Sequence, residues 1–179
     1  VHAVVLSGGS AFGLESTCGV SKYLEENNIG FDVGVAKVPI VVGAVLFDLG
    51  VGNPKSRPNI EMGYRACQVA SDTKLNQGNF GAGCGATVGK IKGIEYAMKG
   101  GIGSHSIKLP NGLVVSALVA VNAFGDVYEN GKVIAGVMDD EKKNVLNSYE
   151  LMKNGVNKGG FSIDNTTIGI VATNAKLDK

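Results

Sequence analysis

Thr166 and Thr167 open an apolar stretch near the end of the chain, and their hydroxyl groups could carry nucleophilic chemistry. Residues 166–173 are mostly β-branched or small, which predicts a buried strand that begins at Thr166. The preceding Asp164 and Asn165 are polar and typical of a turn. If the Asn165–Thr166 bond breaks, Thr166 gains a free α-amine, and this amine can act as the general base for its own hydroxyl without a histidine. An ordinary strand can start with the same residues, so both interpretations stay open here.

Asn122 is a second candidate, because it ends another strand. The apolar run from Leu113 to Val121 predicts this strand, and an amide at its end can aim its NH₂ group at a developing oxyanion. An asparagine that only satisfies a turn fits equally well. The chain has two histidines, His2 and His105, and we expect His105 on a strand surface rather than in the role of a base.

The glycine-rich segment 78–90 predicts a backbone that packs closely or cradles a ligand. It is not a P-loop, because Ile91 follows Lys90 where Ser or Thr is required. Cys84 has no histidine nearby in sequence, and we expect it to behave as a core thiol. Lys90 is normally expected to be solvated, but in a buried pocket it would polarise a hydroxyl or stabilise negative charge.

A second glycine turn, Gly8-Gly9-Ser10, follows an apolar run and precedes residues at helical spacing. This pattern predicts a strand, a turn and a helix that ends near Glu26, with Ser10 as the helix N-cap. The turn lacks the Gly-x-Gly-x-x-Gly motif of dinucleotide sites, and it is not a nucleophile elbow because Phe12 replaces the last glycine. A substrate-lining loop with free amides and a plain tight turn both remain possible.

Length and composition predict one globular domain. The chain has 179 residues, 44% of them hydrophobic and 18% charged, with a formal charge of +1. This charge argues against a nucleic-acid partner, and the absence of a long apolar span argues against a membrane helix. The three cysteines are widely spaced and lack a Cys-x-x-Cys motif, which makes a disulfide scaffold or a zinc site improbable and favours a cytoplasmic protein with reduced thiols.

Other segments must position these groups. We expect a buried strand over Val38–Leu49, and a helix over Glu61–Ala70 whose inner side carries Ile60, Tyr64, Cys67 and Val69. Asn130-Gly131 predicts a hairpin turn between two short strands. The charged segment Asp139–Asn157 is expected to be exposed. Because the chain starts inside an expected strand without an initiator methionine, we expect a fragment that lacks residues at both ends.

Six segments, in this order, resemble the DmpA-type aminopeptidases. This family includes L-aminopeptidase/D-esterases, β-peptidyl aminopeptidases and nylon-oligomer hydrolases. The resemblance covers nearly the whole chain. The segments that carry it are Gly8–Leu14, Val38–Ile40 with Ala44–Leu49, Gly81–Lys90, Met98–Gly103, Val119–Asp126 and Asn165–Thr173.

The resemblance implies an α/β (α+β) fold, specifically an αββα sandwich like that of N-terminal-nucleophile hydrolases but with its own strand connectivity. It also implies one catalytic domain over residues 1–179 that cleaves itself between Asn165 and Thr166. Residues 1–165 would then belong to an α-subunit, and residues 166–179 would begin a β-subunit with Thr166 as its nucleophile. Acidic or hydroxyl residues that the family uses after the nucleophile strand would lie beyond position 179.

Further roles follow from the same resemblance. Asn122 matches the oxyanion-hole asparagine, and Lys90 matches the active-site lysine, with Lys99 as the second choice. Phe47 falls where some members have a tyrosine near the site. With the Gly8-Gly9-Ser10 loop, Phe47 forms the expected substrate-binding set.

The expected function is a self-processing aminopeptidase or amidase that forms an acyl-enzyme on Thr166 and transfers the acyl group to water. Its substrate would be a small peptide or an amino-acid amide or ester, with no metal or cofactor. The resemblance further suggests a homo-oligomer, a tetramer in this family. Two alternatives stay open: an acyltransferase similar to ornithine acetyltransferase, and a non-catalytic homologue in which the bond never breaks.

Overall fold

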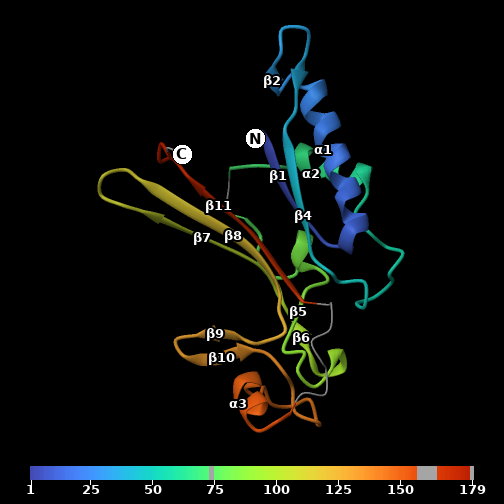
Figure 1. Ribbon diagram of the computed structural model, residues 1–179, viewed down its shortest axis with the longest axis vertical. Coiled ribbons are helices and arrows are strands. Elements are labelled where there is room, and N and C mark those ends of the chain that lie inside the picture. Colours follow the sequence, from blue (N-terminus) through green and yellow to red (C-terminus); the bar gives the residue numbers. More distant parts are fainter. Residues whose placement is uncertain (73–74, 157–164, 178–179) are drawn as a thin grey trace.

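Two facing β-sheets, one of them covered by helices, form the framework of the protein (Figure 1). The computed structural model describes residues 1–72, 75–156 and 165–177. The α-helices of these residues are α1 (Glu15–Glu26), α2 (Ile60–Gln68) and α3 (Ser148–Lys153), and the 3₁₀ helices are η1 (Ser10–Leu14), η2 (Gly81–Gly83) and η3 (Ile94–Tyr96). No helix in this part of the chain has the length and apolar character that a membrane-spanning helix requires.

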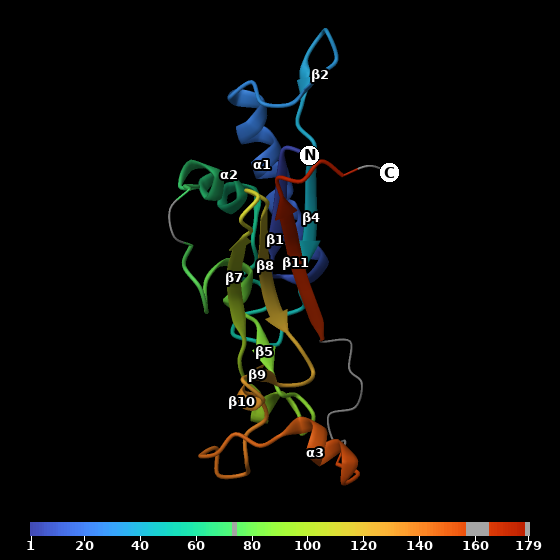
Figure 2. The same cartoon turned by 90° about the vertical axis from the view of Figure 1, so that its left-hand side faces the viewer.

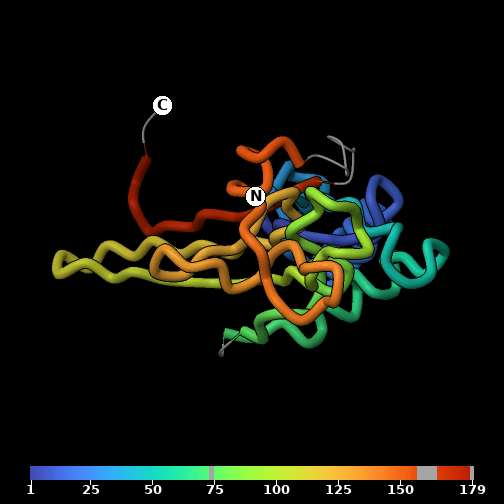
Figure 3. Tube along the Cα trace, turned by 90° about the horizontal axis from the view of Figure 1, so that it is seen from below, coloured from blue at the N-terminus to red at the C-terminus, as the bar shows by residue number. Residues whose placement is uncertain are grey.

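The first sheet pairs β1 (Ala3–Ser7) in parallel with β4 (Val41–Val45). The second sheet has the order β11 (Thr166–Thr173), β8 (Val114–Asn122) and β7 (Gly101–Lys108), and its pairing is antiparallel throughout. The hairpin of β7 and β8 projects away from the body of the molecule, with β11 alongside (Figure 3). Three short hairpins complete the strands: β2 (Phe31–Asp32) with β3 (Lys37–Val38), β5 (Thr87–Val88) with β6 (Met98–Lys99), and β9 (Val127–Glu129) with β10 (Lys132–Ala135).

A small apolar core joins the two sheets. Its buried members are Leu46, Ala82, Ala86 and Ala120, and the half-buried Leu6, Ile102 and Ile168 pack against them. Side chains alternate between the faces of a strand, so Thr166 lies on the same face as Ile168. We call this face, which meets β1 and β4, the inner face of the second sheet. The first residue of β11 therefore points into the space between the sheets.

The opposite, outer face of the second sheet is exposed. Thr167, Gly169 and Val171 lie on it, and Val171 is 73% exposed. Helices α1 and α2 pack together beside the first sheet, and no helix of the described residues covers this outer face (Figures 1 and 2). The mixture of helices and strands confirms the α+β class, whereas the αββα sandwich needs a second helical layer and stays a prediction.

Local sequence predicted several elements correctly. Strand β11 begins at Thr166, β8 ends at Asn122, and the hairpin turn at Asn130-Gly131 joins β9 and β10. His105 is exposed on β7, as expected. The three cysteines are free.

Other predictions were wrong. Ser10 is not an N-cap, because its φ of 55° is left-handed and its side chain caps no helix; η1 comes first and α1 begins at Glu15. The expected strand over Val38–Leu49 is interrupted after Val38, where Pro39 lacks an N–H donor. Strand β11 is not fully buried, because its outer face is open.

Helix α2 also contacts its neighbour differently from the expectation. Val69 is 79% exposed, and the buried residue of α2 is Gly63. A Cβ atom on Gly63 would collide with the main-chain oxygen of Ser16, and one on Gly19 would collide with that of Ile60. The contact between α1 and α2 therefore depends on glycines that let the two backbones approach closely.

We predict that Gly63→Ala destabilises the protein by about 1–3 kcal/mol, because the added methyl group must push α1 and α2 apart. Alanine is the better helix former, so propensity alone would give the opposite sign. Urea denaturation measures the difference. Gly125→Ala is the matched control, since its Cβ meets open space, and it should change the unfolding free energy little. An equally stable Gly63→Ala variant would contradict the close contact.

Candidate active site

The pairing of β11 with β8 brings the two principal candidates together. Thr166 is directly opposite Asn122 in the ladder. Directly opposed residues have Cβ atoms about 4.5–5.5 Å apart and point to the same face of the sheet. Thr166 is half-buried, whereas Asn122 is only 1% exposed. A hydroxyl and a buried amide thus share the inner face at one end of the sheet.

The orientation of the Asn122 amide is set by its hydrogen bonds. Its Oδ1 atom accepts from Lys90 Nζ at 2.8 Å and from the Thr87 main-chain N–H at 3.0 Å. The Thr87 hydroxyl also lies 3.3 Å from this oxygen. On the other side, Asn122 Nδ2 donates to the main-chain oxygen of Phe47 at 2.6 Å. Donors on one side and an acceptor on the other fix which end of the amide is oxygen.

Lys90 is a buried cation at this site. Its residue is 5% exposed, and Nζ also donates to the main-chain oxygen of Asn122 at 3.3 Å. The Lys90 main-chain N–H donates to the Phe124 carbonyl, which ties the segment to the turn after β8. Burying an ammonium group is costly unless it is hydrogen-bonded. The hydrogen bonds from Lys90 Nζ to Asn122 therefore offset part of the cost of burying this side chain. Lys99, the second choice from sequence, is exposed and donates to the Cys84 carbonyl instead.

Asp48 connects the first glycine turn to this region, although the sequence analysis assigned it no role. Its Oδ1 atom accepts the Gly9 N–H at 2.7 Å, across 39 positions of sequence. A side chain at Gly8 or at Gly85 would collide with the Asp48 carboxylate. Both positions must therefore be glycine for the Asp48 carboxylate to fit between the two segments. The only sequence signal was an acidic residue within the otherwise apolar run Val38–Leu49.

A small cavity of about 70 Å³ adjoins the Asn122 amide, since Thr87 and Lys90 both line it and both bond Asn122 Oδ1. Among the described residues, the lining consists of Phe47, Asp48, Gly50, Val51, Thr87, Lys90 and Ile94. Of the expected substrate-binding residues, Phe47 lines the cavity directly. Gly9 donates its main-chain N–H to Asp48, which lines the cavity. Ser10 does not line the cavity, and the Ser10 main-chain N–H donates to the Leu46 carbonyl.

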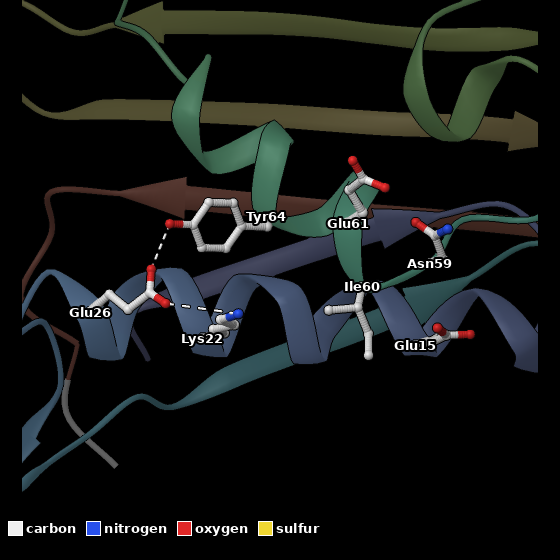
Figure 4. Close-up of a pocket in the computed structure, with 7 residues that line it drawn as sticks. All are labelled: Glu15, Lys22, Glu26, Asn59, Ile60, Glu61 and Tyr64. Carbon is white, nitrogen blue, oxygen red and sulfur yellow. Dashed lines mark hydrogen bonds and ion pairs between the residues drawn. The ribbon is translucent and has the colours of Figure 1, made fainter.

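A larger, open cavity of about 450 Å³ lies between α1 and α2 (Figure 4). Its side chains are Glu15, Lys22, Glu26, Asn59, Ile60, Glu61 and Tyr64. The Glu26 carboxylate accepts the Tyr64 hydroxyl at 2.5 Å, and this hydrogen bond is the main cause of the raised pKa of Tyr64. None of the candidate residues from the sequence lies here. We therefore place the candidate active site at the Asn122 cavity, not between the helices.

Two further expectations concern the surroundings of the site. Cys84 is exposed and its thiol lies 3.1 Å from the Asn79 carbonyl, so the prediction of a core thiol was wrong. Asn165 is half-buried next to Thr166, whereas Asp164 lies outside the described residues. Within the described residues, no group of histidine, cysteine and acidic side chains could hold a metal ion.

Comparison with known proteins adds a family to this geometry. The model of peptidase family S58 matches residues 1–179, in agreement with the DmpA-type resemblance. An uncharacterized aminopeptidase of Mycobacterium leprae is 42% identical over 187 residues, covering 99% of this chain and 50% of the relative. An uncharacterized aminopeptidase of Mycobacterium tuberculosis is 37% identical, covering 99% and 51%. A 6-aminohexanoate-oligomer endohydrolase of Kocuria sp. is 27% identical, covering 98% and 50%. The chain spans about half the length of these curated relatives.

We predict that Asn122→Leu destabilises the protein by about 2–4 kcal/mol, because it removes the acceptor of a buried ammonium group and of the Thr87 N–H. The double variant Asn122→Leu/Lys90→Met should be more stable than Asn122→Leu alone, because the buried charge is then gone as well. Unfolding midpoints in urea of the wild type, both single variants and the double variant complete the cycle. If the loss of unfolding free energy in the double variant equals the sum of the losses in the two single variants, Lys90 and Asn122 are not coupled.

Proposed function

Because the chain belongs to peptidase family S58, we propose that it carries the nucleophile of a self-processing aminopeptidase or amidase. The observation that carries the proposal is the ladder register that sets Thr166 opposite Asn122, whose amide is held by the buried Lys90. A hydroxyl, an amide and a cation then meet at the end of one sheet. The hydroxyl can act as the nucleophile of acyl transfer, and the amide and the cation can stabilise the negative charge that develops on the substrate oxygen.

The proposed reaction starts when water adds across the Asn165–Thr166 bond, which leaves a carboxylate on Asn165 and a free α-amine on Thr166. The Thr166 hydroxyl attacks the carbonyl carbon of an amide or ester, and the α-amine accepts the hydroxyl proton. The same proton then passes to the leaving amine or alcohol as the tetrahedral intermediate collapses. Water attacks the resulting ester on Thr166 Oγ, which releases the acid and restores the hydroxyl.

Asn122 supports this reaction as the oxyanion donor. Its Nδ2 group is a buried amide donor whose orientation is set by the hydrogen bond to the Phe47 main-chain oxygen at 2.6 Å. A preorganised donor of this kind typically contributes about 3 kcal/mol to transition-state stabilisation. Lys90 acts on Asn122 from the other side of the amide, where its ammonium group holds Oδ1 and adds positive charge near the developing oxyanion.

The relatives favour an aminopeptidase over other hydrolases. The two relatives named aminopeptidase are 42% and 37% identical to this chain, compared with 27% for the oligomer endohydrolase. We further propose that the complete protein forms the αββα sandwich and that its second helical layer covers the outer face of β11. A homo-oligomer and a cytoplasmic location are part of the same proposal.

We predict that the purified product of the complete gene consists of two pieces and that the second begins at Thr166. Thr166→Ala should remain a single chain and lose hydrolysis of amino-acid p-nitroanilides, while Thr166→Ser should retain both reactions, because it keeps a hydroxyl and, after cleavage, an α-amine. Intact mass spectrometry and absorbance of released p-nitroaniline measure the two effects.

Thr167→Ala is the matched control, because Thr167 is the neighbouring threonine but lies on the outer face; it should cleave and hydrolyse normally. A second piece that begins at any other residue, or an active Thr166→Ala variant, would end the proposal. Products that form only when an amine acceptor such as ornithine is added would indicate the acyltransferase instead.

A further inference from the structure

Arg57 has a guanidinium group that the proposed reaction does not use. The chain has two arginines, and the other one, Arg65, is paired with Glu61 at 2.5 Å. Within the described residues, Arg57 forms neither an ion pair nor a hydrogen bond through its guanidinium group. It lies instead over the ring of Phe12, with the guanidinium carbon 3.8 Å from the ring centre. The N–H donors of a permanent cation can therefore meet a ligand here.

The contact with Phe12 holds this guanidinium at the surface of the protein. Arg57 is half-buried, and Phe12 is 56% exposed. A guanidinium group stacked on an aromatic face gains cation–π energy and keeps the edge of its plane free for hydrogen bonds. Two of its N–H groups can then donate side by side to the two oxygens of a carboxylate. The arrangement thus suits a carboxylate ligand.

Arg57 lies beside the candidate active site. A Cβ atom on Gly9 would be 3.4 Å from Arg57 Cβ, so the stem of Arg57 packs against the first glycine turn. Gly9 in turn donates its N–H to Asp48, which lines the cavity next to Asn122. Val51 lines the same cavity and opens the segment that leads to Arg57. Figures 1 and 2 show this segment, between β4 and α2, at the end of the sheets where β11 begins.

The charges of a peptide decide which part of it Arg57 can bind. The acyl part of an aminopeptidase substrate carries the α-amine, which is mostly protonated at neutral pH and is repelled by a guanidinium group. The leaving part carries the C-terminal carboxylate, which is the anionic group common to unmodified peptides. In a dipeptide, this carboxylate is on the carbon bonded to the scissile nitrogen, so it remains close to the reacting carbonyl.

From these observations we propose that Arg57 is a specificity-determining residue that binds the C-terminal carboxylate of the leaving part of the substrate. This inference rests on the proposed function, in which the complete protein cleaves aminoacyl bonds with Thr166. The subsite selects short peptides with a free C-terminus over the corresponding C-terminal amides, which are neutral at this position. Arg57→Gln keeps a polar stem that can pack on Gly9 and Phe12, so it separates carboxylate binding from support of the turn.

The test measures binding without turnover. The complete gene product with Thr166→Ala is titrated by calorimetry with alanyl-alanine, alanyl-alanyl-alanine and the C-terminal amide of each, because the two lengths place the carboxylate at different distances from the scissile carbonyl. At one of these lengths, the free acid should bind about tenfold more tightly than its amide, as expected for a charge-assisted bidentate pair. Adding Arg57→Gln should bring this ratio close to one.

Arg65→Gln is the matched control, because it removes the other arginine, which lies on α2 and is already paired with Glu61; it should leave the ratio unchanged. The proposal fails if no peptide binds to the protein that retains Arg57, or if this protein prefers the acid at neither length. It also fails if Arg57→Gln preserves the preference. An equal loss for acid and amide in Arg57→Gln would mean that Arg57 only supports the Gly9 turn, and it too would overturn the proposal.

Failure of the proposed function shows in a different experiment. Cleavage and hydrolysis are measured on the Thr166 variants with p-nitroanilides, which have no C-terminal carboxylate. The peptide titration needs neither reaction, so the ratio of acid to amide reports on the carboxylate subsite alone.

Discussion

The hydrogen-bonded amide of Asn122 is the interaction on which the arrangement of the site depends. It joins the end of β8 to the loop after β4 through Phe47 and to the glycine-rich segment through Thr87 and Lys90. Each of these partners is buried or half-buried, so an unmade hydrogen bond would be expensive. Because β11 is in register with β8, the same amide also fixes the surroundings of Thr166.

Glycine has a structural purpose in this protein beyond forming turns. The chain contains 27 glycines, and several lie where two segments approach too closely for a side chain. Gly19 and Gly63 bring α1 and α2 together, whereas Gly8 and Gly85 make room for the Asp48 carboxylate. Between α1 and α2, glycine allows the two backbones to touch in place of packing between apolar side chains. At Gly8 and Gly85, glycine leaves room for a charged side chain next to the backbone. The small apolar core is consistent with this way of building the fold.

The two faces of the second sheet have different environments. Its inner face packs on β1 and β4 around Leu46 and Ala120, and it carries Thr166 at the end nearest the Asn122 cavity. Its outer face exposes Val171 and has no helix from the described residues over it. Relatives are about twice as long as this chain, so a protein of their length has material for a further layer. The site is thus formed mainly by contacts across the inner face.

Local sequence by itself determined the strands and turns that depend only on neighbours. The β-branched run that starts at Thr166 and the Asn130-Gly131 turn are examples, because side-chain shape and backbone freedom act within a few residues. The motif resemblance also identified Asn122 and Lys90 as candidates. Only the tertiary structure decided that Lys90 rather than Lys99 is buried against Asn122, 32 positions away, and that Asp48 reaches Gly9. Such contacts depend on how distant segments pack, and no local pattern encodes them.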